Sequence, residues 1–395
     1  MKYSSMVNRI SGETVTAWDI HYAACDAQDR GEDAIVLSIG DPDFATADEI
    51  CAAAVQAINE GDTHYTHVIG RPALREAIAA KQSALLGQPV SADNVALVAG
   101  AQNGLYATAM CLFEQGDEVL VPEPMYLTYA ASIQASGACL VPIAQPAEED
   151  FRLTLAALEA VVTDKTRGIA LATPNNPTGN VYTREELEAV ALIAQRHNLW
   201  VISDEVYGQL TYDRPHQSVA TLEGMAERTV VLNSLSKSHA MTGWRVGWMI
   251  GPKPLADHVM HLSLCMLFGI PEFIQNAAQL ALDENLPHVA QMREEYRQRR
   301  DLVCASLNLC PGIQAIRPDG GMFVMVDVRQ TGLSAQHFAE RLLDGYGVSV
   351  LAGEAFGPSA AGHIRIGLVV DRPKLADACR RIVMCVTNML EGRRA

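Results

Sequence analysis

Short apolar runs alternate with amphipathic segments between about residue 94 and residue 234. Continuous runs rich in β-branched residues favour strands buried on both faces, and the longer segments between them carry apolar residues at helical spacing. The strands are expected at 95–98, 118–121, 168–172, 200–203 and 229–233. Strands that alternate with helices form a parallel sheet with helices on both faces. This part of the chain is therefore predicted to be an α/β domain.

The flanking regions follow other patterns. Helical signals occupy residues 1–33, and an apolar run at 34–39 predicts a short strand before Gly40. Beyond Pro271 one long helical stretch, rich in Arg and Glu, reaches Leu309 and is interpreted as a connecting helix with a solvated face. A smaller α+β unit is indicated by strands at 322–327, 348–351 and 363–367 and by helices at 335–343 and at the C-terminus.

Length and composition fit this division. The chain has 395 residues, enough for two domains, and 49% of them are hydrophobic, which allows a large core and excludes global disorder. We expect a large domain at 45–285 and a small domain that combines 1–44 with 286–395.

Charge and cysteine usage limit the partners. The formal net charge of −16 argues against nucleic acid, because neutralising phosphates requires a basic face. No apolar run approaches the ~18 residues of a membrane span, and the N-terminus lacks the apolar core of a signal peptide. Nine cysteines without a C-x-x-C pair, and no zinc-finger spacing, indicate neither a disulfide framework nor a metal site. We expect a reduced, cytoplasmic protein without a metal.

Polar residues follow each expected strand of the large sheet. In open parallel sheets ligands bind outside the carboxyl ends of the strands, so these residues are expected to converge on one site. The clusters are Gly100–Gly104, Pro122–Tyr126, Thr173–Gly179, Asp204–Tyr207 and Ser234–Lys237. Gly40, after the run at 34–39, would let a ligand approach the backbone closely, with an ordinary turn as the alternative.

Lys237 stands just past an apolar strand, beside Ser234 and Ser236 and before Arg245. Burial disfavours the ammonium form, and a lysine with a lowered pKa can attack a carbonyl. Two hydroxyls and a guanidinium are donors that suit a phosphate. A carbonyl and a phosphate on one small molecule suggest pyridoxal 5′-phosphate (PLP). For this stretch alone, a surface Lys and Arg beside a turn is the alternative.

PLP chemistry needs further groups around the ring. A carboxylate should keep the ring nitrogen protonated, and Asp204 is the candidate, with a helix N-cap as the alternative. Tyr207 and Asn176 offer neutral donors to the 3-oxygen of the ring. Tyr126 offers an aromatic face for stacking, although a tyrosine considered alone is more often part of a packed core.

The phosphate and the substrate carboxylate also need donors. Gly100, Ala101 and Gln102 lie in a turn before a helix expected at 105–113, and backbone N–H groups at a helix start bind anions. Arg365 lies in an apolar strand and offers a planar fork for the α-carboxylate of an amino acid. A solvated arginine at a strand edge is the alternative.

Five motifs stand in the order and spacing of one family: N-P-T-G (Asn176–Gly179), S-D-E-V-Y (Ser203–Tyr207), S-L-S-K (Ser234–Lys237), G-W-R-V-G (Gly243–Gly247) and I-R-I-G (Ile364–Gly367). Over nearly its whole length the chain resembles the class I/II aminotransferases of PLP fold type I. The resemblance implies a large domain with a mostly parallel sheet sandwiched by helices, and a smaller α+β domain.

The resemblance also implies roles for single residues. It makes Lys237 the cofactor-binding lysine and general base, and it pairs Asp204 with the ring nitrogen. Tyr207 and Asn176 would lie near the 3-oxygen, and Tyr126 would stack on the ring. The implied substrate-binding residues are Gly40, Asn176 and Arg365.

The implied reaction is a ping-pong transfer from an L-amino acid to a 2-oxo acid. The implied assembly is a homodimer with shared active sites, in which Tyr65 reaches the cofactor phosphate of the partner.

Substrate choice rests on a closer resemblance. Aspartate-specific relatives often carry a Lys where this chain has Ala101, which disfavours aspartate. The stretches 233–248, 317–327 and 352–365 are similar to arginine–pyruvate aminotransferases, and this implies L-arginine as donor and pyruvate as acceptor. A guanidinium needs an acidic pocket, for which the candidates are Asp41, Asp43, Glu123 and Glu354.

Other functions remain open at this stage. Donors with aromatic, neutral or aspartate side chains are alternatives, as is a PLP-dependent β-lyase, which shares the lysine, the aspartate and the arginine. A transcription regulator with a degenerate aminotransferase domain would need a DNA-binding domain, and the first strand expected at Ala34 leaves no room for one.

Overall fold

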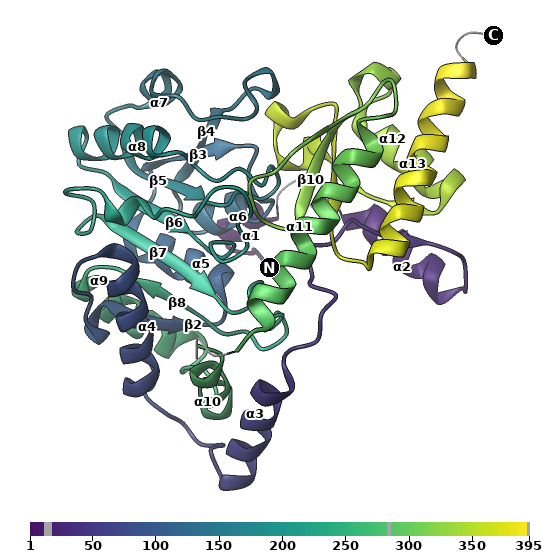
Figure 1. Cartoon of the computed structure of the whole chain (residues 1–395). Coiled ribbons are helices and arrows are strands. Elements are labelled where there is room, and N and C mark those ends of the chain that lie inside the picture. Colours follow the sequence, from purple (N-terminus) through teal and green to yellow (C-terminus); the bar gives the residue numbers. More distant parts are fainter. Residues whose placement is uncertain (12–17, 283–285, 393–395) are drawn as a thin grey trace.

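The computed structural model describes residues 1–11, 18–282 and 286–392. A seven-stranded sheet lies at the centre of its larger part, with the strand order β2-β8-β7-β6-β5-β3-β4 (Figure 1). The strands are β2 (Val95–Val98), β3 (Glu118–Glu123), β4 (Cys139–Ala144), β5 (Thr166–Ala172), β6 (Trp200–Asp204), β7 (Thr229–Ser234) and β8 (Gly247–Ile250).

Strand direction confirms a mostly parallel sheet. Five adjacent strands run parallel to one another: β4, β3, β5, β6 and β7. Strand β8 is antiparallel to both β7 and β2. The sequence pattern did not predict β4 or β8. Strand β4 lies at the sheet edge, is partly exposed and contains Pro142, so it lacks the continuous apolar run of a central strand. Strand β8 is only four residues long and begins at Gly247.

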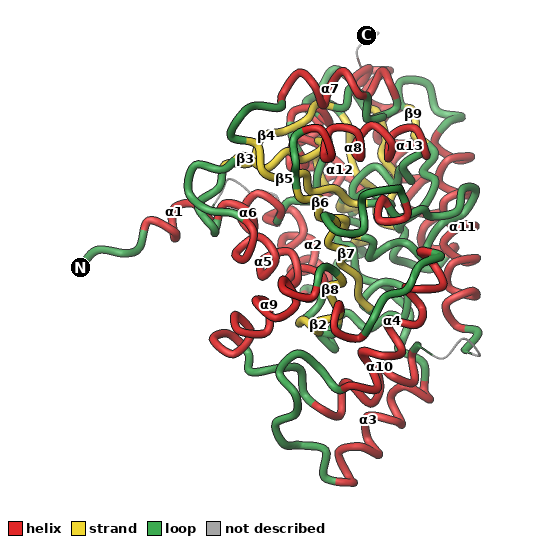
Figure 2. Tube along the Cα trace, turned by 90° about the vertical axis from the view of Figure 1, so that its left-hand side faces the viewer, coloured by secondary structure: helices red, strands yellow, loops and turns green. Residues whose placement is uncertain are grey.

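Helices cover both faces of this sheet (Figure 2). Alternate residues of β5 point to opposite sides: Ala170 packs with one set of helices and Ile169 with the other. The first set is α5 (Ala101–Leu112), α6 (Tyr129–Gln134) and α9 (Lys253–Met266). The second set is α3 (Asp48–Glu60), α4 (Pro72–Leu86), α7 (Leu155–Val161), α8 (Arg184–Arg196) and α10 (Glu272–Ala281). The predicted sandwich of helices around a sheet is confirmed.

The start of α5 differs from the expectation. The turn predicted at 100–104 was wrong, because α5 already begins at Ala101. Gly100 is its N-cap, with a φ of 86° that favours glycine. The small residues that resembled a turn are the first turn of the helix, and they leave its initial backbone N–H groups at the sheet edge.

A second, antiparallel sheet lies beside the first part of the molecule (Figure 1). Its order is β12 (Leu351–Ala352), β13 (His363–Gly367), β10 (Phe323–Asp327) and β9 (Gln314–Ile316). It shares a core with α2 (Asp19–Asp29), α11 (His288–Leu307), α12 (Ala335–Tyr346) and α13 (Arg372–Gly392). Within this sheet Arg365 pairs with Met325 on one side and Leu351 on the other.

Three expectations for this region need correction. The strand at 34–39 is only β1 (Ile35–Val36), which pairs in parallel with β11 (Val348–Ser349). The strand at 348–351 is divided between β11 and β12, which belong to different sheets. The single helix beyond Pro271 is two helices, α10 and α11.

The helix α11 also has a buried basic face that was predicted to be solvated. Arg299 and Arg300 are buried because each guanidinium has a carboxylate partner, Asp43 for Arg299 and Asp213 for Arg300. Charge composition alone does not reveal such pairing.

Two features are absent from the described residues. These residues contain no helix that is both long and apolar enough to cross a membrane. Nor do they hold a group of three or more His, Cys, Asp or Glu side chains suited to a metal ion. The division into domains at 45–285 and at 1–44 with 286–395 stays a prediction.

Candidate active site

A cleft of about 410 Å³ opens at the carboxyl ends of β5, β6 and β7, where it meets β13 of the second sheet. We call it the central cleft. Twelve predicted site residues line it: Gly40, Ala101, Gln102, Tyr126, Asn176, Asp204, Tyr207, Ser234, Ser236, Lys237, Arg245 and Arg365. The other two predicted residues, Gly100 and Tyr65, do not line it, although Gly100 packs closely against Arg245, which does. The topology therefore brings residues far apart in sequence into one space.

Lys237 follows β7, and its Nζ donates a hydrogen bond to the backbone oxygen of Gly40. Burial lowers the pKa of Lys237 to about 8. The charge of Asp41 opposes this shift, and the charge of Arg365 adds to it. A large fraction of the amine is then neutral near pH 8, which a nucleophile or a general base requires. The surface-turn alternative does not fit a buried lysine.

Gly40 is required by packing as well. A Cβ at this position would lie 2.7 Å from the ring of Phe323, so a larger residue would displace that ring. The backbone oxygen of Gly40 is thereby held against Lys237.

Asp204 is the last residue of β6, and its carboxylate has two partners. Oδ2 accepts a hydrogen bond of 2.8 Å from the hydroxyl of Tyr129, and Oδ1 accepts one of 3.2 Å from the amide of Val206. Burial raises the pKa of Asp204 to about 6, although both bonds favour the charged form. No α-helix begins at the residues after Asp204, so the N-cap alternative is wrong.

Arg365 lies in the middle strand β13 and is only 2% exposed, which excludes a solvated strand edge. Its Nη1 donates 2.9 Å to Oδ1 of Asn176, and its Nη2 donates 3.0 Å to the backbone oxygen of Ser38. The guanidinium lies 4.1 Å from the ring centre of Phe323. Burial lowers the pKa of Arg365 to about 10, so the group remains charged at neutral pH.

One nitrogen of this guanidinium has no partner. Nε of Arg365 is buried and makes no hydrogen bond with any described residue, and a buried donor without an acceptor is costly. Nη1 and Nη2 each carry a second N–H, which can bind an anion in the central cleft that Arg365 lines.

Two tyrosines border the same space. Burial raises the pKa of Tyr207, and a hydrogen bond to Asn176 lowers it by less. The hydroxyl of Tyr207 therefore stays a neutral donor. Burial also raises the pKa of Tyr126, whose ring stands nearly perpendicular to Tyr129 at 6.5 Å between centres.

A set of donors suited to an anion lies at the other end of the central cleft. Arg245 is held by hydrogen bonds of 2.8 Å to the backbone oxygens of Thr242 and Ala99. A Cβ on Gly100 would lie 2.5 Å from Nη2 of Arg245, so glycine is needed for this approach. Hydroxyls of Ser234 and Ser236 and the first amides of α5 complete the donor set.

Gln102 lies on the first turn of α5 and is fixed by two neighbours. Its Nε2 donates 2.6 Å to Ser132 Oγ, and its Oε1 accepts 2.5 Å from Thr128 Oγ1. The amide is thus used in holding α6 against α5, and its backbone N–H is the group that faces an anion at the helix start.

Tyr65 is 83% exposed and contacts Phe268, with 4.7 Å between ring centres and the rings tilted by 53°. It does not line the central cleft of its own chain. Its predicted contact with the cofactor of a partner chain stays a prediction.

The four acidic residues proposed for a guanidinium pocket differ in location and in hydrogen-bond partners. Asp41 lines the central cleft. Asp43 is bound by Arg299 at 2.6 Å, and Glu123 is buried and accepts hydrogen bonds from the amide and hydroxyl of Ser359. The assignments of Asp43 and Glu123 to that pocket were wrong, because both carboxylates already have internal partners.

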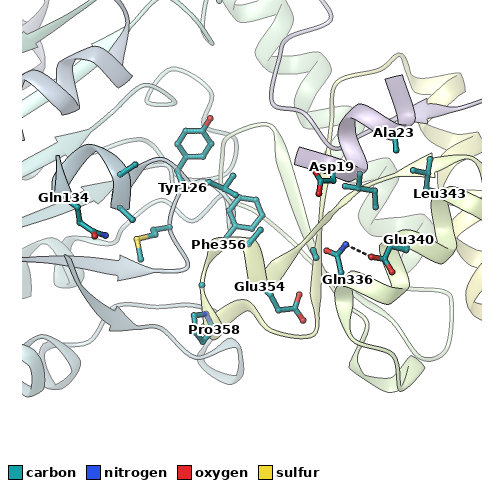
Figure 3. Close-up of a pocket in the computed structure, with 18 of the residues that line it drawn as sticks. Asp19, Ala23, Tyr126, Gln134, Gln336, Glu340, Leu343, Glu354, Phe356 and Pro358 are labelled. Carbon is teal, nitrogen blue, oxygen red and sulfur yellow. Dashed lines mark hydrogen bonds between the residues drawn. The ribbon is translucent and has the colours of Figure 1, made fainter. Parts of the chain in front are cut away.

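Glu354 lines a neighbouring cavity of about 1040 Å³, which shares Tyr126 with the central cleft. We call it the acidic cavity, because its lining carries Asp19, Glu340, Asp344 and Glu354 against one arginine, Arg9. Figure 3 shows Tyr126 and Phe356 on one side of this space and Asp19, Glu340 and Glu354 on the other.

Some residues of the central cleft were not found from the sequence. Tyr129, Trp18 and Thr242 line it, and Tyr129 holds Asp204 directly. Tyr129 follows a polar cluster at the end of β3, but nothing in the sequence indicates that it pairs with Asp204. Only the packing of α6 on the sheet brings the two together.

The residues present fit PLP. A buried amine of lowered pKa suits its carbonyl, a buried carboxylate suits its ring nitrogen, and the donor set at α5 suits its phosphate. The guanidinium of Arg365, which lines the central cleft, suits the carboxylate of an amino acid.

Comparison with known proteins agrees with this chemistry. A family model for aminotransferase class I and II matches residues 32–382. The chain is 54% identical over 390 residues to arginine–pyruvate transaminase AruH of Pseudomonas aeruginosa, with 99% of each chain covered. It is 36% identical to aromatic-amino-acid aminotransferase 2 of Thermococcus litoralis, with 89% of this chain and 91% of the relative covered.

A solved structure supports the fold. Aspartate aminotransferase from Thermus thermophilus with maleate superimposes with a TM-score of 0.92 at 31% identity, covering 98% of this chain and all of that one.

Proposed function

We propose that this chain, which belongs to the class I and II aminotransferases, moves the amino group of L-arginine to pyruvate in a ping-pong reaction. Enzymes of this family depend on PLP, and the fold is PLP fold type I. The observation that carries the proposal is the central cleft, where the half-buried lysine Lys237 and the half-buried carboxylate of Asp204 meet the buried guanidinium of Arg365.

The cations of the central cleft support a donor without a side-chain carboxylate. Among the described lining residues the basic side chains are Lys237, Arg245 and Arg365. We assign them to the cofactor carbonyl, the cofactor phosphate and the α-carboxylate, respectively. None is left to neutralise a second carboxylate, and Ala101 provides no charge. Aspartate and glutamate would therefore bring an unpaired buried charge, which costs several kcal/mol.

The acidic cavity supports a cationic donor. Glu354 accepts hydrogen bonds through Oε1 from the amides of Ala335 and Gly362, which fix its position, and Oε2 has no recorded partner among the described residues. Phe356 lines this cavity and also contacts Arg365, at 4.9 Å from the guanidinium carbon to the ring centre. We propose that the long side chain of a donor held by Arg365 extends toward this cavity, where its guanidinium would exchange water for carboxylate acceptors. The identity to AruH points to the same donor.

The residues of the central cleft receive the following proposed roles. When bound, PLP supplies an electron sink for the carbon that loses a proton. Lys237 binds the cofactor covalently and then, as the free amine, moves the proton from the α-carbon. Asp204 holds the proton on the ring nitrogen, and Tyr129 fixes Asp204. Arg365 binds the α-carboxylate together with Asn176 and the backbone at Gly40.

The other roles concern placement of the cofactor. Tyr207 donates to the ring oxygen, and Tyr126 stacks on the ring. The phosphate is held by Ser234, Ser236, Arg245 and the backbone at Gly100, Ala101 and Gln102.

The assembly that we propose is a homodimer with shared sites. Tyr65 and Phe268 are exposed large aromatic residues in contact with each other, which a second copy would cover. The first residues and α1 (Ser5–Ile10) extend away from the body of the chain (Figure 2). Sedimentation of the holoenzyme at micromolar concentration would give the mass of two chains, and a single-chain mass would contradict the proposal.

A cytoplasmic location is part of the proposal as well. It is supported by nine free cysteines, of which Cys304, Cys310, Cys379 and Cys385 are buried. Such thiols remain reduced in a reducing compartment.

A panel of amino donors tests the substrate assignment. With pyruvate as acceptor, kcat/KM for L-arginine should exceed those for lysine, tyrosine, methionine and aspartate at least tenfold. Lysine should be poorer because an ammonium does not match a planar fork of acceptors. A tyrosine or aspartate donor that exceeded arginine tenfold would overturn the arginine assignment. Release of pyruvate and ammonia without an added oxo acid would indicate a β-lyase.

A further inference from the structure

Behind Asp204 lies a second buried carboxylate, Glu205, which has no part in the roles described above. It is 1% exposed, and its backbone amide donates 2.8 Å to Leu232 of the neighbouring strand β7. Neighbouring residues of an extended chain point to opposite sides, so Glu205 faces away from the central cleft while Asp204 faces it. Accordingly, Asp204 lines the cleft and Glu205 does not.

Three side chains hold this carboxylate. Oε1 accepts hydrogen bonds from Ser203 Oγ at 2.9 Å and from Ser218 Oγ at 2.6 Å. Oε2 accepts a hydrogen bond of 2.9 Å from Nε2 of His216. Both serines are fully buried, and His216 is nearly so. A carboxylate with three such donors is fixed in place by hydrogen bonds rather than merely packed.

His216 lies at the other oxygen of this carboxylate. Its Nε2 is hydrogen-bonded to Oε2 of Glu205, and its Nδ1 is buried without a partner among the described residues. Within the described ranges no lysine or arginine pairs with Glu205. The negative charge of Glu205 therefore lies beneath the strand end and acts on Asp204.

We propose that Glu205 is a positioning residue for Asp204: it anchors the end of β6 and adds a fixed negative charge that favours a protonated ring nitrogen in the central cleft. This inference rests on the proposed role of Asp204. The groups that face Asp204 are Tyr129 from α6, Lys237 after β7, Tyr207 and Glu205 itself. Of these, Glu205 alone adds negative charge, and its charge contributes to the raised pKa of Asp204.

The test compares Glu205→Gln with a matched control, Glu186→Gln. Glutamine keeps the shape, and its oxygen can still accept the serine hydroxyls. Its NH2 group would face Nε2 of His216, which accepts in the other tautomer, so the substitution removes the charge and keeps a hydrogen bond at each partner. Glu186 is also a buried glutamate, but it serves α8 by accepting hydrogen bonds from the amides of Leu153 and Thr183. Both variants lose a buried carboxylate, and only one loses it behind Asp204.

Three quantities are measured on the holoenzymes and apoenzymes. In Glu205→Gln the pH midpoint of the bound cofactor's visible absorbance should fall by about 0.5–1 unit, because a nearby anion no longer favours protonation. The affinity of the apoenzyme for PLP should fall about 3–10-fold by titration calorimetry, and kcat about tenfold, with KM for the donor within twofold of wild type. In Glu186→Gln all three should equal wild type.

The outcomes separate this inference from the proposed function. If the midpoint and kcat of Glu205→Gln match those of Glu186→Gln, the positioning role is wrong. If Asp204→Asn also leaves kcat unchanged, the role of Asp204 is wrong as well.

Should Glu205→Gln not fold, Ser218→Ala carries the test, since it removes one donor and keeps the charge. A fall of kcat by threefold or more at unchanged KM would support the anchoring role. An unchanged kcat in that folded variant would overturn it.

Discussion

The central cleft and the acidic cavity share Tyr126, yet their charged side chains differ in how far they are exposed to water. In the central cleft Arg365 is buried and Lys237 is half-buried, and burial lowers the pKa of each. In the acidic cavity Glu340 and Glu354 are exposed, and water screens them. Buried groups that are held in place act strongly on whatever binds them, whereas solvated charges act weakly. The proposed function places the chemistry in the first region and the choice of donor in the second, and the comparison predicts effects of very different size.

The largest effect is expected at Lys237. Lys237→Ala removes both the covalent attachment of PLP and the group that moves the α-proton, so kcat should fall by about 10⁴-fold or more. PLP should remain bound through the other contacts. Borohydride reduction followed by peptide mass spectrometry should attach the cofactor to Lys237 in the wild type and to no lysine in the variant. Attachment to another lysine would show that the central cleft is wrongly assigned.

Asp204→Asn should have the next largest effect. Without the carboxylate the ring nitrogen loses its protonated state, and kcat should fall by about 10²–10⁴-fold. The substrate carboxylate still finds Arg365, so KM should change little. A kcat within tenfold of wild type, about 1.4 kcal/mol, would mean that Asp204 serves only the local turn through Val206.

The same substitution should stabilise the apoenzyme. Because burial raises the pKa of Asp204 from 3.8 to about 6, the folded state binds this proton more tightly than the unfolded state does. Stability from this group is present below pH 3.8 and is lost as the pH rises through 6, by at most about 3 kcal/mol. Apo Asp204→Asn should therefore unfold at a higher temperature than the wild type at pH 8 and at a similar temperature near pH 4. Equal unfolding temperatures at pH 8 would show that the site carries no such strain.

Arg365→Lys should affect every amino and oxo acid alike. The lysine keeps a charge but loses the planar fork, and Asn176 and Ser38 lose their donors, so kcat/KM should fall about 10²-fold. Amines that lack the α-carboxylate should be affected less than threefold. An equal loss for amines and amino acids would make Arg365 a structural residue of β13.

The same contrast explains what the sequence could and could not predict. Asp204 and Lys237 come at or after the ends of apolar strands, and a parallel sheet carries such residues to one edge, so both could be selected without a structure. Arg365 could be selected for another reason, because it is an arginine within an apolar strand. Tyr129 could not, because its bond to Asp204 depends on how α6 packs. The pairing of Asp43 with Arg299 could not be predicted either, because the packing of α11 brings together two positions that are far apart in sequence.

Fold predictions failed where the local signal was weak. The partly exposed edge strand β4 and the four-residue β8 have no long apolar run, and they were missed. The start of α5 was misplaced because small residues such as Gly104 are common in turns, whereas here Gly104 is buried and packs close to Val98 and Leu232. Tertiary packing decided each of these cases.

The smallest effect is expected in the acidic cavity. Glu354→Gln keeps the acceptor for the amides of Ala335 and Gly362 and removes one charge. At an exposed site such a charge contributes about 1 kcal/mol, so kcat/KM for arginine should fall about 3–10-fold, while methionine and tyrosine change less than twofold. The loss should shrink at high salt, because screening weakens the wild-type interaction as well. Glu188→Gln, which removes an exposed glutamate on α8 far in sequence from the cavity, is the matched control and should leave all donors unchanged. If Glu354→Gln lowered kcat/KM equally for arginine and methionine, the acidic cavity would have no part in donor choice, and the carboxylate that recognises a cationic donor would have to be Asp41 in the central cleft.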